Sequence, residues 1–131
     1  MIARIASIVL RVCGVLAVLL GLLFWSGNAL TLVPLHMLLG LLVVLSLWIV
    51  GIGQAFSSRG SWPLAFGALL LGLLVIVVGM RQSSLMVGPF HWVIQVVHLL
   101  LGILAVGVGQ IAAARWRNSS AIREEQPSRA V

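Results

Sequence analysis

The stretch "GPFHWVIQVVHLLLG", residues 88–102, opens a long apolar run that carries two histidines and the amide of Gln95. At 100° per residue, His91, Gln95, His98 and Gly102 share one face of a helix. Lipid cannot satisfy such polar groups, so a helix that crosses a membrane turns this face toward other protein. The stretch therefore predicts a membrane helix that packs within a bundle.

Composition extends this prediction to the whole chain. Of its 131 residues, 62% are hydrophobic and only 8% are charged, whereas about a quarter of a soluble domain is charged. All eight cationic residues are arginines that flank apolar segments, which is typical of membrane topology rather than of nucleic-acid binding. We expect an integral membrane protein surrounded by the lipid bilayer, with no nucleic-acid partner.

Four apolar runs define the expected architecture. They cover about residues 5–26, 30–56, 62–80 and 89–114. Each is close to or above the ~20 residues that a helix needs to cross the hydrocarbon layer. We expect an all-α fold, an integral membrane four-helix bundle over residues 1–114. The polar segment 115–131 is expected to be a mobile cytoplasmic tail that lies on anionic headgroups.

Short matches in the same order indicate an internal repeat of the two halves. They are "LLGLL" at 19–23 and 70–74, "HMLLG" at 36–40 with "HLLLG" at 98–102, and "GIGQ" at 51–54 with "GVGQ" at 107–110. The repeat predicts two tandem helical hairpins related by a pseudo-twofold axis along the membrane normal. The first run also resembles a secretory signal peptide cleaved after Ala29, but the repeat uses this run and favours its retention.

The repeat leaves the relative depth of the histidines open. His36 precedes Gln54 by 18 residues, whereas His98 precedes Gln110 by 12. Aligning the glutamine motifs places His36 beside His91, and aligning the histidine motifs pairs His36 with His98. The two alignments differ by roughly 9 Å of helix rise.

Histidines on facing helices can take both axial positions of a haem iron. Gly40 and Gly102, each four residues after a histidine, leave room for a flat macrocycle. In these matches and in its helix count, the chain resembles the b-type four-helix membrane cytochromes. The resemblance implies one haem b held by His36 and His98, with His91 as the alternative ligand, and electron exchange with a quinol or a protein partner.

Two other interpretations remain open. The histidines can join helices through hydrogen bonds, in which case the protein is a non-catalytic subunit or scaffold of a larger membrane complex or a homo-oligomer. Thioethers and imidazoles near the outer face also form a soft ligand set that suits copper. The copper candidates are Met37, Met80, Met86, His36 and His91.

Several small residues are assigned to packing alone. Gly14 and Gly21 are seven residues apart, as are Gly72 and Gly79, and small residues on one face let membrane helices approach closely. Cys13 lies in an apolar segment and is expected to be a small buried side chain. Acids occur only at residues 124 and 125, so no hydrolytic site is predicted.

The arginines predict a multi-pass protein of the inner (plasma) membrane with both termini in the cytoplasm. If the four runs alternate in direction, seven arginines fall on one side and Arg81 on the other, and positive residues collect on the cytoplasmic side. A reporter fused after Val131 should therefore be active in its cytoplasmic form, and one inserted in the 81–88 loop in its exported form. The opposite pattern would overturn the orientation.

Overall fold

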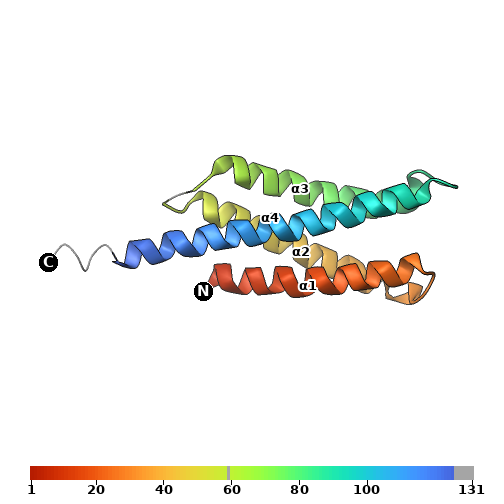
Figure 1. Ribbon diagram of the computed structural model, residues 1–131, viewed down its shortest axis with the longest axis horizontal. Coiled ribbons are helices and arrows are strands. Elements are labelled where there is room, and N and C mark those ends of the chain that lie inside the picture. The colour runs from red at the N-terminus through yellow and green to blue at the C-terminus, as the bar shows by residue number, and fades with distance from the viewer. Residues whose placement is uncertain (59, 126–131) are drawn as a thin grey trace.

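The computed structural model describes residues 1–58 and 60–125, with side chains through Ser119. This part of the chain is all-helical and contains no strand, and its long helices form a bundle (Figure 1). They are α1 (Ile2–Trp25), α2 (Val33–Ala55), α3 (Trp62–Arg81) and α4 (His91–Glu125), with the 3-10 turns η1 (Leu30–Leu32) and η2 (Gln82–Ser84). The expected four-helix bundle is confirmed, and each helix is long and apolar enough to cross a membrane.

Turn chemistry separates the helices. After α1, Gly27 takes a φ of 77° and Ala29 a φ of 56°, left-handed conformations that end a helix. Pro34 occupies the first turn of α2, where its missing N–H costs nothing. The Ser61 hydroxyl caps α3 by accepting from the Leu64 N–H at 3.4 Å, which satisfies one of the unpaired donors of a helix start.

Helix α4 continues into the segment that the sequence predicts as a polar tail. Helix α4 runs on from His91 to Glu125, so residues 115–125 are helical, while 126–131 lie outside the described residues. The physical reason is local: "RWRNSSAIREE" contains no glycine or proline, and the next helix breaker in the sequence is Pro127. The apolar run ends where the sequence becomes polar, but the helix continues through the polar residues.

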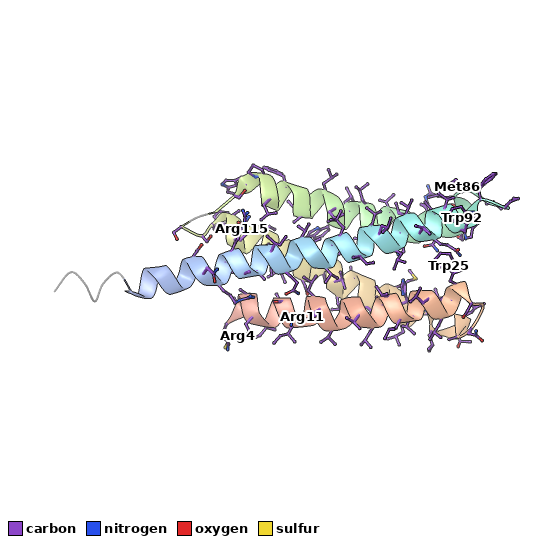
Figure 2. The ribbon with its side chains drawn as sticks, viewed as in Figure 1. Arg4, Arg11, Trp25, Met86, Trp92 and Arg115 are labelled. Atoms are coloured by element: carbon purple, nitrogen blue, oxygen red, sulfur yellow. The ribbon has the colours of Figure 1, made fainter. Side chains whose placement is uncertain are left out.

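Helices α2 and α4 form the centre of the bundle. Each of them contacts all three other long helices, and α1 and α3 pack on either side of the pair. The start of α1 and the end of α4 lie at one end of the bundle, which we call the inner end (Figure 1). Arg4 and Arg115 lie at this end, whereas Trp25 and Trp92 lie at the opposite, outer end (Figure 2). This arrangement agrees with the alternation that the topology prediction assumes.

The expected arginine asymmetry can be followed only in part. Arg59 and Arg129 lie outside the described residues, and Arg123 is described as backbone alone.

Small side chains bring the helices together. A Cβ on Gly51 of α2 would lie 2.8 Å from the Ala68 Cβ of α3, and one on Gly109 of α4 would collide with Leu10 of α1. Leu10 and Leu47 are fully buried, and Cys13 is buried beside them as expected. Because lipid tails are as apolar as these side chains, such close packing stabilises helix association in a membrane.

The amides of Gln54, which is buried, and Gln110, which is partly buried, join the start of one helix to the inner half of another. The Gln54 side chain donates to the Ser61 carbonyl at 2.7 Å and accepts from the Ser61 N–H at 3.3 Å. The Gln110 side chain donates to the Ser7 carbonyl at 3.0 Å and accepts from the Ser7 hydroxyl at 2.7 Å. Each glutamine of the repeated Gly-x-Gly-Gln motif thus binds a serine near the start of an odd-numbered helix.

Replacing Gln54 should destabilise the bundle. Its side chain is 0% exposed, and Gln54→Ala leaves the Ser61 N–H and carbonyl without their partner, which costs about 1–2 kcal/mol. We expect the midpoint of thermal unfolding in detergent to fall by several degrees. The matched control is Gln82→Ala in η2, which removes an amide that makes no hydrogen bond to residues 1–58 or 60–119 and should leave the midpoint unchanged. Equal midpoints for the two variants would contradict this role.

Candidate functional site

The rings of His36 and His98 are neighbours between the two central helices. Their centroids are 6.3 Å apart and their planes are inclined at 56°. The Phe24 ring of α1 meets the His36 ring edge-on at 5.4 Å. The structure therefore brings together the two histidines that follow from aligning the histidine motifs.

This pairing follows from the unequal spacing within the two hairpins. Helix α2 has six more residues between its histidine and its glutamine than α4 has, so both motifs cannot be level at once. Because the two rings lie at the same depth along the bundle, the two glutamines lie at different depths. Gln54 binds Ser61 in the loop at the inner end, whereas Gln110 binds Ser7 one turn and a half into α1.

Glycines of the flanking helices lie against the two rings. A Cβ on Gly21 of α1 would lie 3.5 Å from Cε1 of His36. A Cβ on Gly79 of α3 would lie 2.8 Å from Cε1 and 3.4 Å from Nε2 of His98. The spacing of both glycines predicted helix packing but not their contact with the histidines. Their seven-residue spacing from Gly14 and Gly72 was the available signal, but it does not say which side chain they face.

Three buried ring nitrogens have no hydrogen-bond partner within the described part of the chain. They are Nδ1 of His36, Nδ1 of His98 and Nε1 of Trp48. An unpaired buried polar atom costs about 1–3 kcal/mol. The Trp48 nitrogen can only donate, and it lies over Gly72 of α3. An imidazole nitrogen can also bind a metal, so the histidine pair has a chemical capacity that the tryptophan lacks.

Open space adjoins the histidine pair. Gly40 and Gly102 lie one turn inward from His36 and His98 and are half-buried. A Cβ on either glycine would meet no atom within 4 Å. The same holds at Gly67 and Gly107, whereas a Cβ on Gly21 or Gly79 would contact a histidine ring.

His91 belongs to a different environment. Its Nδ1 lies 3.2 Å from the Leu85 carbonyl, so the ring holds the loop before α4. The methionines of the copper interpretation, Met37, Met80 and Met86, are exposed. Within the described residues, no three His, Cys, Asp or Glu side chains come close enough to hold a metal ion.

Comparisons with protein-family models, with curated proteins and with solved structures each found no match.

Gly79 and Gly102 should respond oppositely to the same substitution. Gly79→Ala adds a methyl group that collides with the His98 ring, so the ring must shift. We therefore expect a lower unfolding midpoint in detergent. Gly102→Ala places the methyl group in open space and gains up to about 1 kcal/mol of helix propensity, so the midpoint should stay or rise. Equal losses of stability in the two variants would show that the space beside Gly102 is filled.

Proposed function

We propose that this protein is a small b-type membrane cytochrome that holds one haem between His36 and His98 and transfers electrons. The observation that carries the proposal is the neighbouring pair of rings, 6.3 Å apart at their centroids. An imidazole nitrogen binds a first-row metal at about 2 Å, so the centroids of two rings on opposite sides of one iron are roughly 6 Å apart. The separation in the bundle suits that arrangement.

The surroundings of the pair also fit a haem. Each ring has a buried Nδ1 without a hydrogen-bond partner among the described residues, although the Ala17 backbone lies close enough to the His36 ring to interact with it. The space at Gly40 and Gly102 lies beside the pair, where a flat macrocycle needs room. Half-buried Leu39 and Leu101 pack nearby against the apolar core, and an apolar wall is the usual surrounding of a haem.

Bound between two histidines, a haem supplies one-electron transfer. With both axial positions taken by side chains, no position is left for a substrate, which favours electron transfer over oxygen chemistry. The role of the chain is then to orient the rings. Phe24 and Gly21 lie against the His36 ring and restrict its orientation. Gly79 restricts the orientation of the His98 ring in the same way.

Each hairpin contributes one ligand to this site and one glycine that lies against it. His36 of α2 contacts Gly21 of α1, and His98 of α4 contacts Gly79 of α3. This correspondence supports the tandem repeat with an axis along the membrane normal. His36 lies in the first turn of α2, and His98 is two turns into α4. The haem therefore lies toward the outer end, where a quinol or a protein partner in the plasma membrane exchanges electrons with it.

A reduced-minus-oxidised visible spectrum of the purified protein, produced with haem in supply, tests the proposal. We expect b-type bands in the wild type, their loss in His36→Ala and in His98→Ala, and their retention in His91→Ala. Loss of the b-type bands in His36→Ala and His91→Ala alone would indicate a haem site at the outer surface. A colourless wild type would contradict the proposal and favour a non-catalytic subunit of a larger membrane complex.

Gly102→Leu provides a control that leaves both histidines in place. It fills the open space with a side chain suited to a membrane helix, so the protein should remain folded and lose haem. Normal haem content in this variant would show that the macrocycle does not occupy that space.

A further inference from the structure

A charged side chain lies within the membrane-spanning part of α1. Arg11 precedes Trp25 by 14 residues, which is roughly 21 Å of helix. If Trp25 marks the outer boundary of a hydrocarbon layer about 30 Å thick, the Arg11 backbone lies roughly 9 Å inside the inner boundary. The side chain is exposed on the bundle surface. A guanidinium at this depth requires a partner or a route to the headgroups.

The contacts of Arg11 fix the position of its side chain but do not neutralise its positive charge. Its Nη2 donates to Oε1 of Gln110 at 3.1 Å, and the same oxygen accepts from the Ser7 hydroxyl. Ser7 is only 4% exposed, so the amide is anchored at the seam between α1 and α4. A guanidinium has five N–H donors, and the others have no acceptor among residues 1–58 and 60–119.

Two further arginines extend this seam toward the inner end. Arg4 precedes Arg11 by seven residues on α1, and Arg117 follows Gln110 by seven on α4, so each shares a helix face with its partner. Both are exposed. Figure 2 shows Arg4 and Arg11 on α1, both away from the Trp25 end.

The contact register brings these arginines to similar depths. Gly14 packs on Val106 and Ser7 binds Gln110, so α1 and α4 run antiparallel and Arg4 lies within about one turn of the level of Arg117. No acidic residue occurs before position 124, roughly 10 Å further along α4 than Arg117. Three cations therefore line the seam without an acid beside them in the first 123 residues.

Above Arg11 the same seam is apolar. Val15, four residues after Arg11, and Ile103, seven residues before Gln110, are exposed. Gly107 between them is exposed, and a Cβ on it would meet no atom within 4 Å. The seam thus combines one arginine inside the hydrocarbon layer and two arginines nearer the headgroups with an apolar surface that leads deeper into the layer.

We infer that the inner end of the α1–α4 seam binds an anionic phospholipid. The phosphate accepts from Arg11 and from the arginines below it, since guanidinium groups bind phosphate oxygens in a bidentate manner. One acyl chain lies along Val15 and Gly107. A soluble polyanion cannot reach Arg11 at this depth, and a zwitterionic lipid leaves more of the positive charge unbalanced. This inference does not depend on haem binding.

Lipid-dependent stability of the full-length protein in detergent tests this inference. Adding phosphatidylglycerol should raise the unfolding midpoint, because a ligand that binds the folded state stabilises it. Phosphatidylcholine and inorganic phosphate should raise it much less. Arg11→Gln should lower the apparent affinity for phosphatidylglycerol on the order of tenfold.

The matched control is Arg115→Gln. Arg115 is two residues from Arg117, so it lies on the opposite flank of α4, yet it carries the same charge at the same end of the bundle (Figure 2). Its substitution should leave the affinity nearly unchanged. If Arg11→Gln does not fold, the double variant Arg4→Gln/Arg117→Gln takes its place. Equal losses in the control and seam variants, or equal stabilisation by phosphatidylcholine, would overturn the site.

Discussion

A bilayer core contains no water, and this constraint applies to the polar side chains of helices long and apolar enough to cross it, as the four long helices of this protein are. Each such side chain must find a partner within the bundle or lie near the headgroups. Gln54 and Gln110 meet the constraint by binding serines near the starts of neighbouring helices. Arg11 meets it in part through Gln110. The buried Nδ1 atoms of His36 and His98 do not meet it within the described residues, and for this reason the histidine pair is the strongest candidate for a functional site.

Composition and run length were sufficient to predict the helix count, because spanning segments are long, apolar and nearly free of charge whatever the details of packing. Helix periodicity also accounts for the direction of the α2 face that carries His36, since Val43, Leu47 and Gln54 share that face and are buried. The end of α4 was not predictable from polarity. A helix ends where its backbone is interrupted, and residues 115–125 contain no residue that interrupts it.

For the candidate site, the sequence predicted one histidine and left a choice between two partners for it. The sequence named His36 but offered two partners, because the repeated motifs imply two registers that differ by six residues. The register that forms is the one in which the side chains of the helices fit together best. This fit exists only once the helices are assembled. Gly79 illustrates the point: its contact with His98 depends on the relative depth of α3 and α4, which no local pattern encodes.

Helix α4 is longer than the membrane requires. Its 35 residues extend over roughly 52 Å, whereas a bilayer with its headgroups is about 40–45 Å thick. With its first residue at the outer interface, the helix ends several ångströms beyond the inner headgroups. It is therefore a rigid spacer as well as a membrane anchor. The helical part that projects from the bilayer sets both the height of Glu125 above the lipid surface and the direction in which the chain leaves the membrane.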